Sequence, residues 1–300
     1  MRHSPRDTNI LTLRANSGAA LRTALGVWGV IALVIIACWP ISVRVWHYWV
    51  DADNNHVLGG RGVCVSLLAF WLLYRARGSL NSAAPRRLPW AATLLLLAAA
   101  ATLLTWLGDL TAWQALMLPT LMLLGILTLY GPAVTRAAAV PIAFLYLAAP
   151  AWDELLGPPL QKLTLWVMSW AAPVSGIPAS VSGSVISLPG HMSVEVAQGC
   201  SGVGFLIEGV AIAALLGEFE GARWQRRLAL VAGIIPVALL ANWARVLLLV
   251  YIGYSSGMRH ILVTRYHLQF GYVVFSAVLL AFLWLVTRYN PTRTPEAVAS

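Results

Sequence analysis

Three residues in the C-terminal part of the sequence have side chains that together could cleave an amide bond: Cys200, Arg245 and His267. A cysteine thiolate is a strong nucleophile, and an imidazole can take up its proton and later donate it to a leaving amine. An arginine stays charged and can stabilise the oxyanion of a tetrahedral intermediate. These three residues therefore form a candidate acyl-transfer site if the fold brings them together.

Cys200 lies at a sharp change of polarity. The polar segment 195–199 precedes it, and an almost wholly apolar run follows at 203–216. That run predicts a membrane helix, whose first N–H groups lack helical partners and whose dipole is positive at this end, so both favour a thiolate. The N–H groups of Ser201 and Gly202 could add to an oxyanion site. The alternative is that Cys200 is only a small buried hydrophobic residue.

The composition is that of an integral membrane protein. Hydrophobic residues make up 59% of the 300 residues and charged residues only 10%, and the mean hydropathy is +0.76. Soluble domains carry about 25% charged residues. The formal charge of +9 lies in short loops between apolar stretches, which indicates control of topology and no nucleic-acid partner. The three cysteines show no metal-site or disulfide spacing, and we expect no metal and no cofactor.

Apolar stretches of about 20 residues predict eight spanning helices. They lie at 23–42, 56–74, 88–107, 110–130, 136–152, 201–217, 228–253 and 269–287. Residues 155–172 are apolar but are interrupted by Pro158, Pro159, Gln161 and Lys162, so a helix lying in the membrane interface is favoured over a further span.

The segment before Cys200 carries the strand signals of the chain. Residues 181–188 and 191–196 alternate polar and apolar side chains, with Pro189 and Gly190 between them. This pattern predicts a small β-hairpin leading into Cys200. The predicted fold is thus an all-α polytopic membrane protein of about eight transmembrane helices, with an interfacial helix and a small periplasmic β-hairpin.

The distribution of Lys and Arg predicts the orientation in the membrane. With the N-terminus in the cytoplasm, fourteen of the 20 Lys and Arg residues fall on that side and four on the other. We therefore expect both termini in the cytoplasm. The expected parts are a basic cytoplasmic tail (1–22), a five-helix membrane region (23–152), a periplasmic segment (153–199), a three-helix catalytic core (200–287) and a second cytoplasmic tail (288–300).

This topology predicts that the three candidate residues share one membrane face. Cys200 begins the sixth span at the outer side, and His267 lies at the outer start of the eighth. Arg245 lies 17 residues after Leu228, or about 26 Å along a helix, near the outer surface of a core about 30 Å thick. The alternatives are an arginine that merely snorkels to the interface and an interfacial histidine.

Four further residues are candidates for supporting roles, two of them Ser201 and Gly202. Asn242 lies three residues before Arg245, so it shares a helix face and could orient the guanidinium or the substrate; the alternative is a bond between helices. Glu208 lies about 12 Å below Cys200, and a carboxylate that deep should have a partner. Arg61 is one candidate partner, and a protonated Glu208 bonded to a neighbour is the alternative.

Three motifs in this order resemble the signatures of the exosortase/archaeosortase family. They are Gly199-Cys-Ser-Gly202, Ala241-Asn-Trp-Ala-Arg-Val246 and His267-Leu-Gln-Phe-Gly-Tyr-Val-Val-Phe275. The similarity covers roughly residues 140–287. The chain departs from the usual pattern at Val203-Gly204, where many members carry a bulkier and often basic pair, so the subfamily stays open.

The resemblance implies a cysteine protease and transpeptidase of the bacterial inner membrane. Its partners would be the lipid bilayer, secreted proteins with a C-terminal sorting signal of the PEP-CTERM type, and an unidentified acceptor nucleophile. By resemblance, Cys200 is the nucleophile, Arg245 stabilises the oxyanion and His267 is the acid and base. The alternative function is that of a non-enzymatic polytopic component of exopolysaccharide or envelope export.

Overall fold

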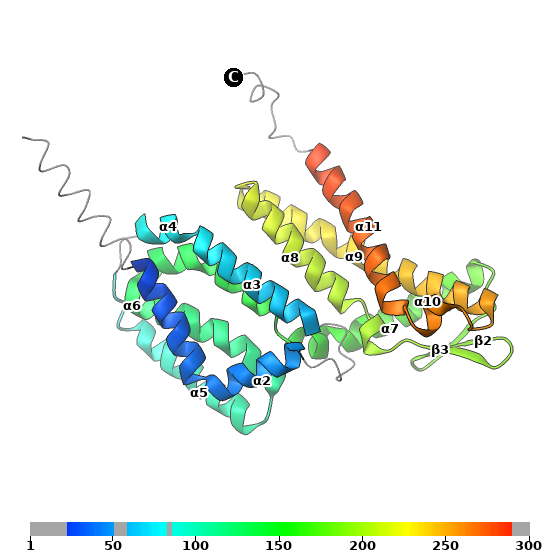
Figure 1. The fold of residues 1–300 in the computed structure, drawn as a ribbon, viewed down its shortest axis with the longest axis horizontal. Helices are drawn as coiled ribbons and strands as arrows, with labels where there is room; N and C mark the ends of the chain where they lie inside the picture. Colours follow the sequence, from blue (N-terminus) through cyan, green and yellow to red (C-terminus); the bar gives the residue numbers. More distant parts are fainter. Residues whose placement is uncertain (1–22, 51–58, 83–85, 290–300) are drawn as a thin grey trace, which may run out of the picture. The chain divides into compact units, whose positions relative to one another are not determined.

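The computed structural model describes residues 23–50, 59–82 and 86–289. The predicted tail 1–22 and most of the tail 288–300 lie outside these residues. The chain divides into two compact units, Met1–Ala151 and Trp152–Ser300 (Figure 1).

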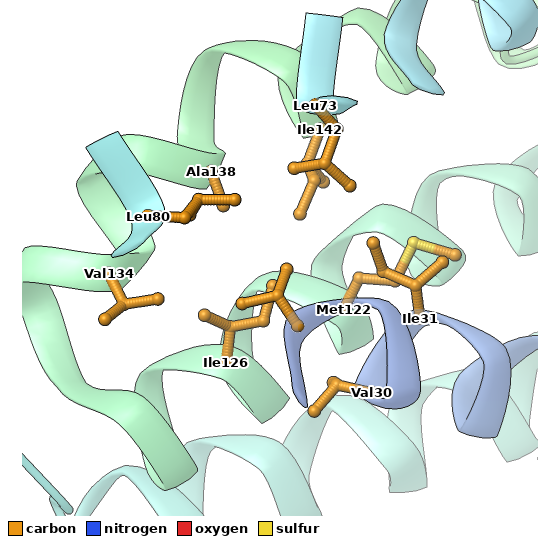
Figure 2. Close-up of a cluster of buried hydrophobic side chains, with 10 residues drawn as sticks. Val30, Ile31, Leu73, Leu80, Met122, Ile126, Val134, Ala138 and Ile142 are labelled. Carbon is orange, nitrogen blue, oxygen red and sulfur yellow. The ribbon is translucent and has the colours of Figure 1, made fainter. Parts of the chain in front are cut away.

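The first unit consists of helices packed around α6. In chain order they are Thr23–Ala37, α2 (Trp39–Val50), α3 (Gly59–Arg75), α4 (Arg77–Ser82), α5 (Ala91–Leu107) and α6 (Thr111–Leu147). Helix α6 contacts α2, α3, α4 and α5. Its buried side chains, among them Ile126 and Ile142, meet Val30, Ile31 and Leu73 in one apolar cluster (Figure 2).

Helix α6 covers two of the predicted spans and is kinked where they were expected to separate. Gly131 has non-helical torsion angles, with φ at 80°. Pro132 has no N–H, so the carbonyl of Thr128 loses its helical partner. The N–H of Leu88 donates to that carbonyl at 3.1 Å, and the N–H of Arg86 donates to the carbonyl of Tyr130 at 2.9 Å. The segment before α5 therefore satisfies the carbonyls that the kink leaves open.

The second unit contains a long helix, a small sheet and a helical group around α9. Its elements are α7 (Ala151–Val174), β1 (Ser180–Ser182), β2 (Val185–Leu188), β3 (Met192–Glu195), a 3₁₀ turn (Gln198–Cys200), α8 (Val203–Phe219), α9 (Trp224–Ser256), α10 (Ile261–Thr264) and α11 (His267–Arg288). Helix α9 packs against α8 and α11 (Figure 1). Apolar side chains of α7, the sheet and α9 form one buried cluster.

The sheet has three antiparallel strands in the order β1-β2-β3, one more than the predicted hairpin. The expected first strand, 181–188, is divided by a two-residue turn at Gly183 and Ser184. Gly183 adopts a φ of 58°, which glycine adopts at no steric cost. The turn in the middle of the alternating run was missed, because alternation continues on both sides of it. The predicted turn at Pro189 and Gly190 joins β2 to β3.

Helix α9 is longer at both ends than the span predicted at 228–253. It ends where Gly257 takes up the left-handed conformation, at a φ of 59°. The N–H of Met258 then donates to the carbonyl of Gly253 at 2.8 Å, a hydrogen bond typical of a glycine-terminated helix. The interfacial helix predicted at 155–172 is likewise longer in the structure, as α7.

The chain is a mostly helical, multi-pass membrane protein. Within the described ranges, α6, α9 and α11 are each long and apolar enough to cross a membrane. The pair Thr23–Ala37 and α2 adds a fourth span if its 87° bend is counted within one crossing. The predicted number of eight is not confirmed: α3, α5 and α8 have 17 residues each, at the lower limit for a span.

Candidate active site

Cys200 is the last residue of the 3₁₀ turn that joins the sheet to α8. Its N–H donates to the carbonyl of Ala197 at 2.8 Å. The cap of α8 is Gly202, with a φ of 93°, so the cysteine lies two residues before the cap. The side chain is half-buried and packs at the edge of the apolar cluster between α7, the sheet and α9. The local fold therefore presents the thiol on a tight turn at the start of a helix.

Arg245 of α9 reaches this thiol. Its Nη2 lies 3.9 Å from Cys200 Sγ, and the residue is only 2% exposed. Among the described residues no carboxylate forms a salt bridge with it. Because a buried charge is stable only when it is paired, a sulfur anion at Cys200 would be a suitable counter-ion. The charge is therefore available to the chemistry of the site.

Aromatic and glycine contacts hold the arginine in place. The guanidinium carbon lies 5.5 Å from the ring centre of Phe205 on α8, and that ring stacks on Phe275 of α11 with centres 4.6 Å apart. A Cβ atom at Gly271 of α11 would lie 2.6 Å from Nε of Arg245. Glycine at position 271 thus lets α11 approach the arginine side chain directly.

His267 is the first residue of α11 and lies on the helix face that meets the arginine. Residues 267, 271 and 275 are spaced four apart, so their side chains share one face of α11. Since Gly271 borders Arg245 and Phe275 stacks on Phe205, this face is directed at α8 and α9. No hydrogen bond joins His267 to Cys200 among the described residues. Its Nδ1 is buried without a partner in that part of the chain.

Asn242 contacts the backbone of the cysteine rather than the guanidinium. The side chain is fully buried, and its Nδ2 donates to the carbonyl of Cys200 at 3.0 Å. The same nitrogen lies 3.4 Å from Oγ1 of Thr164 on α7. A Cβ atom at Gly202 would lie 2.9 Å from Cγ of Asn242. The asparagine therefore packs directly under the Cys200–Gly202 turn.

Ser201 uses its polar atoms in structure. Its Oγ accepts a hydrogen bond from the N–H of Val203 at 3.4 Å, which satisfies one of the first N–H groups of α8. Its carbonyl accepts from Oγ1 of Thr164, also at 3.4 Å. The sequence does not single out Thr164, because its burial and its contact with the Ser201 carbonyl appear only in the structure.

Two candidates from the sequence remain, Glu208 and its possible partner Arg61. Glu208 is half-buried in α8, and its side chain is not without a partner there. The side chain of Arg61, its candidate partner, lies outside the described part of the structure.

Buried polar atoms without partners occur in one turn of α9 and at the start of α11. Within the described part of the second unit, four buried side-chain atoms have no hydrogen bond: Asn242 Oδ1, Trp243 Nε1, Arg245 Nε and His267 Nδ1. All four belong to two short segments, 242–245 of α9 and the start of α11. Buried polar atoms are ordinarily satisfied, and two of these, Asn242 Oδ1 and Arg245 Nε, belong to residues that contact Cys200, so a ligand bound there could supply their partners.

The fold and the site define a class: a multi-pass helical membrane protein with a thiol beside a buried arginine. The family model of transmembrane exosortases (Exosortase_EpsH) matches residues 49–284, and the chain belongs to this family. The match begins well before residue 140, so α3 and α5 follow the family pattern as well as the three motifs. No curated protein and no solved structure matches the chain.

Proposed function

We propose that the protein is a cysteine protease and transpeptidase that cleaves a C-terminal, membrane-anchored sorting signal at the periplasmic face. The observation that supports this most directly is the 3.9 Å approach of a buried Arg245 Nη2 to Cys200 Sγ in a member of the exosortase family. A buried guanidinium beside a thiol provides both a nucleophile and a stabilising charge for acyl transfer.

In the proposed reaction, Cys200 Sγ attacks the carbonyl carbon of the scissile peptide bond. A C–S bond forms, and the carbonyl electron pair moves to the oxygen, where Arg245 stabilises the negative charge. His267 takes the thiol proton and donates it to the leaving nitrogen as the C–N bond breaks. The product is a thioester on Cys200. An acceptor amine or hydroxyl, or water, then attacks the thioester and restores the thiol.

The architecture of the second unit supports a substrate that is itself anchored in the bilayer. Helices α9 and α11 are both apolar enough to span the membrane, and both contribute to the site. The apolar helix of a sorting signal could approach these helices from the lipid and place the bond that precedes it near Cys200. The resident membrane would be the bacterial inner membrane, with both termini cytoplasmic.

The test is substitution of the nucleophile combined with trapping of the intermediate. With a reporter protein that carries a PEP-CTERM-type C-terminal segment, Cys200→Ala should abolish processing while the protein still accumulates in the membrane. Cys64→Ala and Cys38→Ala, which remove the other two thiols, should process normally. Mass analysis should find the N-terminal reporter fragment joined to Cys200. Processing by Cys200→Ala at the rate of the unchanged protein would refute the proposal.

The second candidate is a non-enzymatic component of envelope export. The bonds from Asn242 to the Cys200 carbonyl and to Thr164 favour it, since such contacts between helices also stabilise membrane proteins without catalysis. A structural component should tolerate Cys200→Ala in its export function, or else fail to accumulate. The same variant therefore separates the two candidates.

A further inference from the structure

Helix α7 contacts the cysteine segment on both sides of the thiol. Before it, Nε2 of Gln161 donates to the carbonyl of Val196. After it, Oγ1 of Thr164 donates to the carbonyl of Ser201 at 3.4 Å. Gln161 and Thr164 are three residues apart and so lie on one face of α7. A single helix face thus holds both ends of the six-residue stretch from Val196 to Ser201 that contains Cys200.

Thr164 also joins this attachment to α9. Its hydroxyl lies 3.4 Å from Nδ2 of Asn242 as an acceptor and donates to the Ser201 carbonyl. Asn242 in turn donates to the Cys200 carbonyl. Thr164 and Asn242 are both fully buried, and Ser201 is 1% exposed, so water does not compete for these bonds. The carbonyl of Cys200 is therefore directed toward Asn242, and the next carbonyl, that of Ser201, is directed toward Thr164.

The direction of these carbonyls fixes the direction of the amides that follow. The described chain has no cis peptide bond, and in a trans peptide the C=O and the next N–H point to opposite sides of the unit. Because the Ser201 carbonyl is directed at Thr164, the N–H of Gly202 is directed away from α7. The hydrogen bond from Thr164 to the Ser201 carbonyl, which holds the turn, therefore also orients the N–H of Gly202, two residues after Cys200.

We infer that Thr164 is a positioning residue for the reaction, acting with Gln161 and through Asn242 on the Cys200–Gly202 turn. This inference rests on the proposed function, which requires the turn to hold the thiol in line with the scissile carbonyl; the N–H of Gly202 would add a second donor to the oxyanion. Small losses of alignment are costly in such reactions, up to about 100-fold in rate for a displacement of about 1 Å.

The experiment compares Thr164→Val with Thr164→Ser in full-length protein that carries Cys38→Ala and Cys64→Ala. Valine keeps the shape of threonine and removes the hydroxyl, whereas serine keeps the hydroxyl. Processing of the reporter with a PEP-CTERM-type segment should fall about 10- to 100-fold in Thr164→Val and stay within about threefold in Thr164→Ser. Ser169→Ala is the matched control, because its hydroxyl on α7 bonds, among the described residues, only to the carbonyl of Trp166.

A second readout separates positioning from loss of structure. Iodoacetamide alkylates an accessible thiol without needing an aligned oxyanion site, so the alkylation rate of Cys200 should change less than about threefold in Thr164→Val. A disordered turn would expose the half-buried thiol and raise that rate. Normal processing by Thr164→Val, equal losses in the valine and serine variants, or a large rise in alkylation would each overturn the inference.

Two further variants keep the test decisive. If Thr164→Val does not accumulate, Gln161→Leu breaks the other attachment at a half-buried position and should slow processing at least fivefold. Normal processing by that variant would overturn the inference. Cys200→Ala is run in parallel. If Cys200→Ala still processes the reporter, the proposed function itself fails. If Cys200→Ala does not process the reporter but Thr164→Val processes it normally, only the positioning role of Thr164 fails.

Discussion

The guanidinium of Arg245 is held from several sides by Phe205, Gly271 and Cys200. Phe205 lies under it, Gly271 borders its Nε, and Cys200 Sγ lies within reach of Nη2. A buried cation that is surrounded by apolar groups keeps a strong field at short range, because little water screens it. At the scale of the residue, the site therefore depends on packing as much as on the identity of the three polar side chains.

Gly271→Ala should displace the arginine from the thiol. The added Cβ would lie 2.6 Å from Nε and 3.0 Å from Cδ of Arg245, so the side chain must move. We expect the variant to accumulate normally and to process the reporter about 100-fold more slowly, the effect of losing one stabilising donor. Gly233→Ala on α9 is the control, since its Cβ would meet only Phe282 at an ordinary 3.6 Å. Equal activity of the two variants would contradict the prediction.

Gly202→Ala should destabilise the cysteine turn more than Gly221→Ala destabilises its loop. Both glycines have a positive φ, 93° and 58°, so alanine costs about 1 kcal/mol of backbone strain at each. Only at Gly202 would the methyl group also meet Asn242, at 2.9 Å; at Gly221 the space is open. Thermal unfolding in detergent should show the larger drop in Tm for Gly202→Ala. Matching Tm values would mean that Asn242 adapts without loss.

At the scale of the element, hydropathy located the helices but not their limits. The apolar runs predicted every long helix of the described chain, yet α7 and α9 extend beyond them because helix ends depend on local caps such as Gly257. The kink in α6 follows from Gly131 and Pro132, which the hydropathy pattern shows only as a gap between two spans. The third strand was missed because a two-residue turn leaves the alternation intact.

The candidate site was predictable in part for a physical reason. Arginine and asparagine are rare in apolar helices, and Cys200 lies where a polar segment meets an apolar run, so these three residues stand out in the sequence. Thr164 does not stand out, because threonine is common in membrane helices and its importance here comes from a contact 37 residues away in the chain. The same is true of Gly271, whose role depends on the arginine that it faces. The catalytic roles themselves remain proposals.

Gly131→Ala should strongly destabilise the first unit. The residue has a φ of 80°, and a Cβ atom there would overlap the backbone carbonyl oxygen of Arg86. Since backbone cannot move aside as a side chain can, we expect a loss of about 3 kcal/mol in the free energy of unfolding. Gly29→Ala, in a helix with open space around it, should be neutral or slightly stabilising. Denaturation in detergent measures both, and an unchanged stability of Gly131→Ala would refute this account of the kink.

At the scale of the whole molecule, the two ends of α9 should lie on opposite sides of the membrane. Arg223 precedes this helix and Arg259 follows it. In a background without the three native cysteines, Arg259→Cys should react with a membrane-impermeant maleimide in spheroplasts, and Arg223→Cys should react only after lysis. The reverse pattern would place the candidate site on the cytoplasmic side and would contradict the proposed periplasmic reaction.

The length of α9 makes bilayer thickness relevant to the proposed reaction. Its 33 residues extend about 50 Å, and Arg245 lies about 32 Å from the start, whereas the hydrocarbon core is about 30 Å thick. The thiol and the arginine are fixed to each other by tertiary contacts, but a substrate anchor is free to tilt when hydrophobic mismatch changes. Acyl-chain length in the surrounding lipid would then shift the scissile bond along the bilayer normal relative to the sulfur, so that the membrane itself helps to select which bond is cut.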